Sequence, residues 1–165
     1  RSWAGILIAP LIALTSCSAL EKYDVTLNER SLYSPRSLFE DYHIADPGLA
    51  SCVAQAIEDD LIYTSSGLEV LNCSDAGIRS LSGLSQFQAL QRIKLTDNGV
   101  RNLVELTSLE RLTELQLDSN LIVDIVPLVN LPALEHVNLM GNDALQCHSL
   151  DRFNDQVQVT KPEHC

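Results

Sequence analysis

The stretch LQRIKLTDNGV, residues 90–100, decides how this chain folds. It begins at Leu90 and ends just after the turn dipeptide Asn98-Gly99. The same arrangement recurs every 22 residues. The leucines that open its copies are Leu68, Leu90, Leu112 and Leu134. The shared pattern is L-x-x-L-x-L-x-x-N-x-L, and a repeat of this length predicts a stack of similar structural units.

The spacing of the leucines inside one copy favours a short strand over a helix. Leu112, Leu115 and Leu117 are three and two residues apart. On a helix, five residues turn through about 500°, which would carry the last leucine away from the first. On a strand, Leu115 and Leu117 share one face, and Pro127 would interrupt a long helix. Each copy is therefore predicted to be a strand, a turn and a returning arm, and stacking of the copies buries the leucines.

This pattern resembles the leucine-rich-repeat signature over residues 68–147. The 22-residue length and the apolar positions at every third residue resemble the short class found in bacterial internalins and in phosphatase-regulator-like repeats. The repeats start at residues 68, 90, 112 and 134. The resemblance implies an α/β leucine-rich-repeat solenoid with short parallel strands on a concave face.

One asparagine position is common to most of the repeats. Asn98, Asn120 and Asn142 stand at the same register. Their amides are expected to satisfy backbone groups of the turns, which would otherwise be buried without a partner. The first repeat carries Ala76 there, so the ladder of amides should begin one repeat late.

Both ends of such a solenoid need a cap, because the core would otherwise be exposed. Residues 46–67 are predicted to form an N-terminal cap helix, with Asp46 as N-cap and Pro47 in the first turn. An apolar stripe follows at helical spacing, and its members are Leu49, Cys52, Val53, Ala56 and Ile57. Residues 148–165 are predicted to form a C-terminal cap.

The five cysteines indicate an exported protein with one special thiol. They are Cys17, Cys52, Cys73, Cys147 and Cys165. If Cys17 has a separate role, the other four allow three disulfide connectivities. A cap helix over the first repeat would bring Cys52 to Cys73, which occupies an inward position. The ending resembles a C-terminal cysteine cap, which implies the pair Cys147–Cys165. Each bridge closes a loop of about 20 residues, worth roughly 3 kcal/mol in the chain-entropy model.

The N-terminal residues resemble an export signal. Residues 3–14 are almost wholly apolar, and this run is shorter than the roughly 20 residues of a bilayer span and typical of a signal-peptide core. The residues Leu14-Thr15-Ser16-Cys17 follow, and they resemble the lipobox of bacterial lipoproteins. The resemblance implies a signal peptide at 1–16 and a lipid on Cys17. Residues 17–45 are predicted to be an N-terminal segment that serves in part as a tether, and Leu38 to Ile44 are expected to pack on the cap helix. Ser18 resembles the outer-membrane sorting class of Gram-negative lipoproteins.

Two other interpretations of this N-terminal region stay open. It could be an ordinary secretory signal with a nearby cleavage site, in which case Cys17 would form a disulfide. Residues 3–14 could instead be a buried helix or strand of the mature fold, although Pro10 and the polar change at Glu21 argue against this.

The sequence favours a protein without catalytic or metal chemistry. It contains no G-x-S-x-G elbow, phosphate loop or H-E-x-x-H helix. Cys52 or Cys147 could in principle act as a nucleophile with a histidine, but both are better explained as half-cystines. The pairs Cys147-His148 and His164-Cys165 could suggest zinc, but adjacent ligands do not match the usual spacing. No cofactor is expected apart from the covalent lipid, and no small-molecule substrate.

The concave face is the candidate binding surface. Its predicted residues are Arg92, Lys94, Glu114, Gln116, Asp118, His136 and Asn138. A basic row thus stands beside an acidic row. The two rows could partly neutralise one another through cross-strand pairs, or they could form a mixed polar surface for a protein or glycan. Aromatic anchors are lacking, which argues against binding by stacking.

Composition restricts the class of partner. The chain has 165 residues, with 11 basic and 22 acidic side chains and a formal net charge of −11. This charge opposes binding to nucleic acid or to anionic lipid headgroups. We interpret the chain as a lipid-anchored, non-catalytic protein-interaction module of the bacterial outer membrane, facing the periplasm or the cell surface. The alternatives are a structural envelope lipoprotein without a discrete recognition face, and a secreted leucine-rich-repeat protein that binds a host or extracellular protein.

Overall fold

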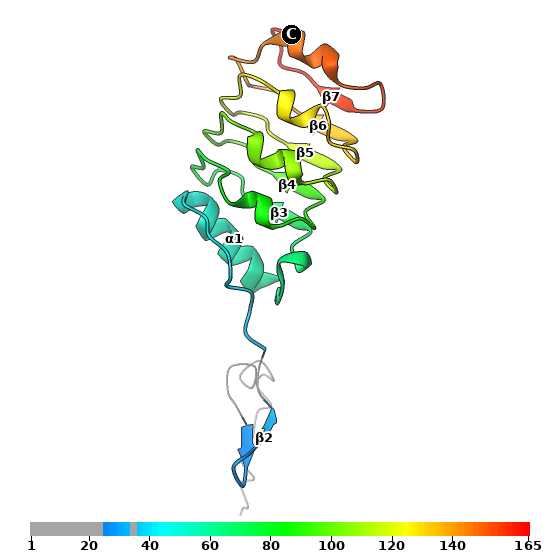
Figure 1. Ribbon diagram of the computed structural model, residues 1–165. Helices are drawn as coiled ribbons and strands as arrows, with labels where there is room; N and C mark the ends of the chain where they lie inside the picture. Colours follow the sequence, from blue (N-terminus) through cyan, green and yellow to red (C-terminus); the bar gives the residue numbers. More distant parts are fainter. Residues whose placement is uncertain (1–24, 34–35) are drawn as a thin grey trace, which may run out of the picture. The chain divides into compact units, whose positions relative to one another are not determined.

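The computed structural model describes residues 25–33 and 36–165, and the chain divides into two units, Arg1–Arg36 and Ser37–Cys165 (Figure 1). The predicted signal peptide, lipobox and lipidated Cys17 lie outside the described residues. Among the helices that the structure describes, none combines the length and the apolar character needed to cross a membrane.

The first unit contains a β-hairpin. Strands β1 (Val25–Leu27) and β2 (Arg30–Tyr33) are antiparallel, and Leu27 faces Arg30 across the turn. The turn residues Asn28 and Glu29 have φ values of 49° and 60°. Positive φ at both central residues gives the backbone twist that a two-residue hairpin turn needs. The sequence predicts only a tether here, so the hairpin is an addition to that prediction.

The second unit is built on a parallel five-stranded sheet. Its strands are β3 (Val70–Asn72), β4 (Arg92–Lys94), β5 (Glu114–Gln116), β6 (His136–Asn138) and β7 (Gln158–Thr160), paired in that order. Neighbouring strands align residues that are 22 apart, so that Leu71 lies beside Ile93 and Ile93 beside Leu115. These central side chains are buried and those on either side point to the opposite face. The predicted repeat of short parallel strands is therefore confirmed.

Short 3-10 helices form the returning arms of the repeats. They are η3 (Leu84–Gln86), η4 (Val104–Ser108) and η5 (Val126–Leu128), and they stack on one another along the solenoid (Figure 1). Each buries one leucine at a 22-residue interval, namely Leu84, Leu106 and Leu128. Leucines from the strands and from the arms thus meet in one continuous core. The additional 3-10 helices are η2 (Ser65–Gly67) and η6 (Cys147–Arg152).

The asparagine ladder is present and starts one repeat late, as predicted. The Asn98 amide oxygen accepts hydrogen bonds from the backbone N–H groups of Ala76 (3.2 Å) and Ile78 (2.9 Å). Its amide nitrogen donates to the carbonyl oxygens of Cys73 and Leu95. The second repeat thereby satisfies the turn of the first. Asn120 and Asn142 donate in the same way one and two repeats later, and their amide oxygens each accept from one N–H group, that of Val100 or Ile122.

Helix α1 (Pro47–Asp59) packs against the beginning of the solenoid beside β3 (Figure 1). Its apolar stripe places Leu49, Val53 and Ile57 in the core. A Cβ atom added to Gly48 would overlap the carbonyl oxygen of Ala76, so the helix approaches the first turn closely. The start of the helix and its apolar stripe agree with the sequence prediction, but the helix ends at Asp59 and not at residue 67, which belongs to a 3-10 helix. Its capping role stays a prediction.

Asp46 connects α1 to the following repeat. One carboxylate oxygen accepts a hydrogen bond from the Leu49 N–H (3.0 Å) and caps the helix. The other accepts from the N–H groups of Arg79 (2.9 Å) and Ser80 (3.1 Å). Partial burial opposes ionisation of Asp46, but these backbone hydrogen bonds outweigh it and lower the pKa below its ordinary value of 3.8.

The lowered pKa of Asp46 predicts a loss of stability in acid. A carboxyl group whose pKa is lower in the folded state stabilises the fold above its unfolded pKa, and this contribution disappears as pH falls through the folded value. We expect Asp46→Ala to lower the free energy of unfolding by about 1–2 kcal/mol at pH 7. The difference from wild type should shrink as pH falls below about 4, because the unfolded state takes up the proton before the folded state does. Urea titrations at pH 7, 5 and 3 measure this.

The matched control is Asp46→Asn, which keeps a cap acceptor but cannot ionise. Its cost should be smaller than that of alanine, because asparagine is a good N-cap residue. A gap between wild type and Asp46→Ala that stays constant down to pH 3 would contradict the role assigned to the charge.

The folded solenoid unit includes the end of the predicted N-terminal segment 17–45. Leu38, Phe39, Tyr42 and Ile44 pack against the core, and the Phe39 N–H donates to the Ile62 carbonyl at 2.8 Å. The rings of Phe39 and Tyr42 also contact Phe87, with centroids 6.1 and 5.5 Å from it. The compact unit starts at Ser37, and the side chains within 38–44 extend its core beside the arms.

The predicted C-terminal cap contains a fifth strand. Residues 148–165 include β7, which pairs with β6 so that His136 faces Gln158 and Val137 faces Val159. The sequence pattern does not reveal this strand, because Gln156 and Lys161 stand where Leu134 and Leu139 stand one repeat earlier. The register and the backbone pairing of the sheet therefore continue in β7, although two leucines of the repeat pattern are absent there.

Candidate functional site

The outward side chains of the sheet form the candidate surface, which we call the strand face. It corresponds to the concave face predicted from the sequence. One row consists of Val70, Arg92, Glu114, His136 and Gln158, and the next of Asn72, Lys94, Gln116, Asn138 and Thr160. Asp118 is the second residue after β5. The buried middle residue of each strand fixes the backbone, so these side chains stand on a rigid support.

All the binding residues predicted from the sequence lie on this face. Strand β4 carries Arg92 and Lys94, β5 carries Glu114 and Gln116, and β6 carries His136 and Asn138. The sequence prediction omits Gln158 and Thr160, because β7 lacks the leucine pattern. The 22-residue offset from His136 and Asn138 was the available signal for both.

Charged residues are adjacent on the face, and neutral groups hold the carboxylates. Arg92 lies beside Glu114 in the register of β4 and β5, and Lys94 lies beside Gln116. The Glu114 carboxylate accepts a hydrogen bond from the Gln116 amide at 3.1 Å. The Asp118 carboxylate accepts from the Thr96 hydroxyl (2.9 Å) and the Asn138 amide (3.2 Å). Neutral donors orient these carboxylates without cancelling their negative charge.

A groove of about 710 Å³ lies at the beginning of the strand face, between α1 and β3. Its lining includes Ser51, Gln55 and Asp59 from the helix and Val70 and Asn72 from the strand. The Val70 side chain is 43% exposed. The groove therefore combines an apolar patch with polar and acidic side chains.

A second groove, of about 550 Å³, lies at the other end of the strand face. It is lined by Asp118 and Asn138, by Met140 and Asp143 after β6, and by Glu163 and His164 near the C-terminal end. Sequence reasoning predicts only the first two as binding residues, although Met140 stands at the same outward position of its repeat as Asp118. The others come from turns whose side-chain directions the repeat pattern does not specify. The result is an acidic margin beside the strands.

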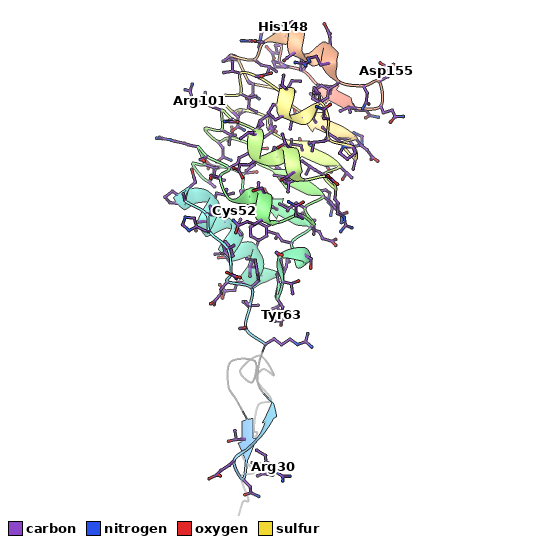
Figure 2. All side chains as sticks on the ribbon, viewed as in Figure 1. Arg30, Cys52, Tyr63, Arg101, His148 and Asp155 are labelled. Atoms are coloured by element: carbon purple, nitrogen blue, oxygen red, sulfur yellow. A yellow bond between two sulfur atoms is a disulfide. The ribbon has the colours of Figure 1, made fainter. Side chains whose placement is uncertain are left out.

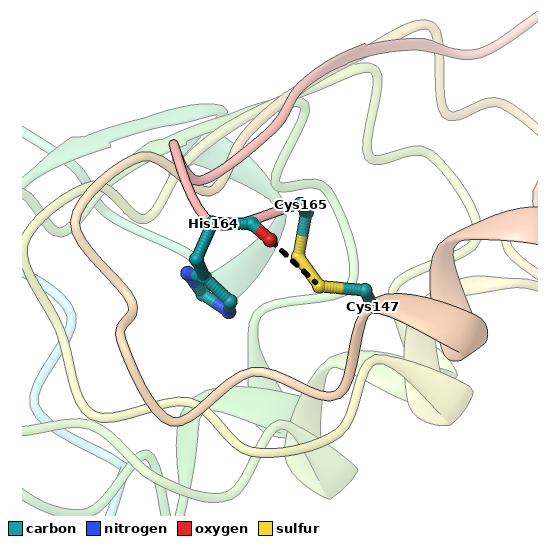
Figure 3. A group of neighbouring side chains, drawn as sticks. All are labelled: Cys147, His164 and Cys165. Atoms are coloured by element: carbon teal, nitrogen blue, oxygen red, sulfur yellow. Dashed lines mark hydrogen bonds between the residues drawn. A yellow bond between two sulfur atoms is a disulfide. The ribbon is translucent and has the colours of Figure 1, made fainter.

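The cysteine and histidine residues near the C-terminal end form a disulfide site (Figure 3). The sulfurs of Cys147 and Cys165 are bonded to each other, as predicted. The His164 ring nitrogen Nε2 lies 3.0 Å from the Leu145 carbonyl oxygen. The donor atoms of these three side chains lie within 4.8 Å of one another, but a bonded sulfur is not a thiolate ligand. The Cys52–Cys73 disulfide is also present, and Figure 2 labels Cys52 on α1.

Comparisons with solved structures agree with the repeat geometry. An internalin (InlF) of Listeria monocytogenes matches 58% of this chain and 30% of its own length, with a TM-score of 0.54 and 22% identity. Internalin C2 of the same species matches 70% of this chain and 57% of its own length, with a TM-score of 0.56 and 21% identity. The chain has a leucine-rich-repeat fold.

These comparisons establish the fold of the leucine-rich-repeat domain and nothing finer. The chain covers less than two thirds of the length of either internalin. No protein-family model matches the chain, and no curated protein matches its sequence.

Proposed function

We propose that this leucine-rich-repeat chain is a lipid-anchored, non-catalytic protein-interaction module of the bacterial cell envelope. The observation that carries this proposal is the strand face, where polar and charged side chains of five parallel strands stand on a buried leucine core. A rigid support reduces the ordering entropy that a binding surface must lose when a partner docks. Solenoids commonly bind partners on such a surface.

Two features support a binding role over catalysis. Cys52 and Cys147, the conceivable nucleophiles, are both half-cystines. The exposed groups of the strand face are spread along a row rather than gathered into a nucleophile, a base and an orienting group, which is the arrangement that covalent catalysis needs.

The lipid anchor is proposed from the sequence, and the disulfides are consistent with it. The two bridges use four of the five cysteines, so a separate role for Cys17 fits the odd count. A thiol that follows an apolar run and two small residues fits the lipobox. The proposed location is the outer membrane, with the domain in the periplasm or on the cell surface.

One experiment in a bacterial host tests anchor and binding face together. The protein is expressed from its complete gene with a photo-crosslinking amino acid in place of Gln158, an exposed position on the strand face. We expect wild type to fractionate with membranes, to have the mass of an acylated chain beginning at residue 17, and to crosslink to a partner. Cys17→Ser should lose the lipid and the membrane attachment.

A triple variant tests whether the strand face binds. Arg92→Ala, Lys94→Ala and Glu114→Ala together should leave the protein folded and membrane-bound but reduce the crosslinked species at least about tenfold. The matched control is Arg101→Ala, Arg111→Ala and Glu110→Ala, which removes the same charges at exposed positions off the strands. Figure 2 shows Arg101 projecting from the solenoid. Undiminished crosslinking in the strand-face variant would instead favour a structural envelope component.

A further inference from the structure

The charges of the strand face are complementary to themselves, and we propose that this face binds a second copy of the chain. The inference rests on the proposed function, because it uses the same surface and names its partner. It follows from three features of the face, namely the order of the charges, the alignment of the strands and the side chains of the flanking strands β3 and β6.

The charge changes sign between β4 and β5 at the same level of the face. Arg92 and Lys94 are both exposed on β4. Glu114 stands directly beside Arg92 on β5, at the strand spacing of about 4.8 Å. Asp118 adds a second negative charge to the β5 side, one position beyond Leu117. The middle of the face is thus divided into a positive half and a negative half.

Only one simple two-fold arrangement pairs these halves favourably. A two-fold axis parallel to the strands, above the face and between β4 and β5, places β4 of each copy over β5 of the other. Arg92 then meets the partner copy's Glu114, and the partner copy's Arg92 meets Glu114, as an isologous interface requires. A two-fold axis perpendicular to the strands would place β4 over β4 and bring like charges together, which costs several kcal/mol.

The side chains of the flanking strands β3 and β6 fit the same two-fold arrangement. Because β3 would lie over β6, Val70 would face His136 and Asn72 would face Asn138 of the other copy. The exposed Val70 side chain would be covered by an imidazole ring, and the two amides can exchange hydrogen bonds. Neither contact places like charges together, because Val70, Asn72 and Asn138 carry no charge.

The dimer should be weak in dilute solution and favoured on a membrane. A face of five strands is only about 20 Å wide, and such an area lies at the low end of specific interfaces. Tethering both copies to one surface would raise their effective concentration without any new contact. The net charge of −11 opposes approach at long range, but physiological salt screens this repulsion beyond about 8 Å.

Charge exchange between two tagged copies tests the proposal. Both copies are expressed as full chains in one bacterial host, with a photo-crosslinking amino acid in place of the exposed Asn72. We expect a wild-type pair to give a crosslinked dimer that carries both tags. Arg92→Glu in both copies, or Glu114→Arg in both copies, should lower the dimer yield at least about tenfold, because like charges would meet at two symmetric contacts.

The deciding measurement pairs one copy carrying Arg92→Glu with one copy carrying Glu114→Arg. Both symmetric contacts then join opposite charges again, so the dimer yield should return to the wild-type level. Arg101→Glu and Glu110→Arg make the same charge changes at exposed positions off the face and should leave the yield unchanged.

Three results would overturn the proposal. They are a wild-type pair without a mixed-tag dimer, a dimer yield unaffected by Arg92→Glu, and a charge-exchanged pair no better than either variant alone. The circular dichroism spectrum of each variant establishes that it is folded. If Gln158 crosslinks to a different protein while no mixed-tag dimer forms, the second copy is the wrong partner and the proposed binding function survives.

Discussion

Replacing Asn120 by alanine is expected to lower the free energy of unfolding by about 3 kcal/mol or more. Asn120 is only 4% exposed. Its amide oxygen accepts a hydrogen bond from the Val100 N–H at 3.1 Å, and its amide nitrogen donates to the carbonyl oxygens of Leu95 (2.8 Å) and Leu117 (3.0 Å). Alanine would leave the Val100 N–H without this acceptor and would remove one of the two amide hydrogen bonds to each carbonyl, because Leu95 also accepts from Asn98 and Leu117 from Asn142. A buried group left unpaired costs about 1–3 kcal/mol, and each further hydrogen bond that is lost costs about 0.5–1.5 kcal/mol.

Urea unfolding followed by circular dichroism measures this loss. The matched control is Asn130→Ala, an exposed asparagine on the arm of the same repeat, for which we expect a change within about 0.5 kcal/mol. Asn120→Asp should cost at least as much as alanine at pH 7, because a carboxylate would face carbonyl oxygens. A loss below about 1 kcal/mol for Asn120→Ala would show that water replaces the amide in the turn.

The repeat could be predicted because one physical requirement fixes several positions at once. A strand that stacks on its neighbour must place Ile93 and Leu115 in the same layer. The turn that follows must satisfy the same backbone groups each time, which fixes Asn98 and Asn120. Residues that are 22 apart in sequence therefore lie side by side in neighbouring repeats. Because side chains alternate between the two faces of each strand, the buried positions also identify the outward ones.

The ends of the solenoid could not be predicted in the same way. At β7 the backbone pairing continues, but the sequence does not indicate it, because Gln156 and Lys161 replace the leucines of the repeat pattern. At the other end, Phe39 and Tyr42 pack beside Phe87 across a long separation in sequence. These contacts are made once and not repeated, so no periodicity indicates them.

The candidate surface also contains a part that the repeat predicts and a part that it does not. The central charges follow from the repeat, since Arg92 and Glu114 are 22 residues apart and must be neighbours. The end grooves do not, because they combine residues such as Gln55 with Val70, and Asp118 with Glu163, whose proximity depends on single loops and on α1.

Removing the Cys52–Cys73 disulfide is expected to lower the free energy of unfolding by about 4 kcal/mol. The sequence separation of 21 closes a loop worth roughly 3 kcal/mol in the chain-entropy model. Cys73 is 2% exposed and belongs to the core cluster, so alanine there also leaves a small void that costs about 1 kcal/mol. The double variant Cys52→Ala with Cys73→Ala avoids leaving an unpaired thiol.

The second disulfide supplies the matched comparison. Cys147 and Cys165 are 18 residues apart, so the chain-entropy contribution is nearly the same. Cys165 is exposed and Cys147 is partly exposed, so replacing both by alanine should cost about 1 kcal/mol less than replacing the first pair. Urea unfolding of both double variants measures the difference, and equal losses would show that burial of Cys73 contributes nothing.

The same variant decides whether α1 acts as a cap. The disulfide joins the helix to the residue that follows β3, and each repeat contacts only its neighbours. If α1 caps the core, loosening it exposes Leu68 and Leu71, and protection against amide hydrogen exchange should fall in β3 and β4 as well as in α1. A loss of protection confined to α1 would show that the first repeat holds its own core and that the helix is an attachment. The gradient of protection from β3 to β7 therefore measures how far the end of the solenoid supports the strands that carry the charged face.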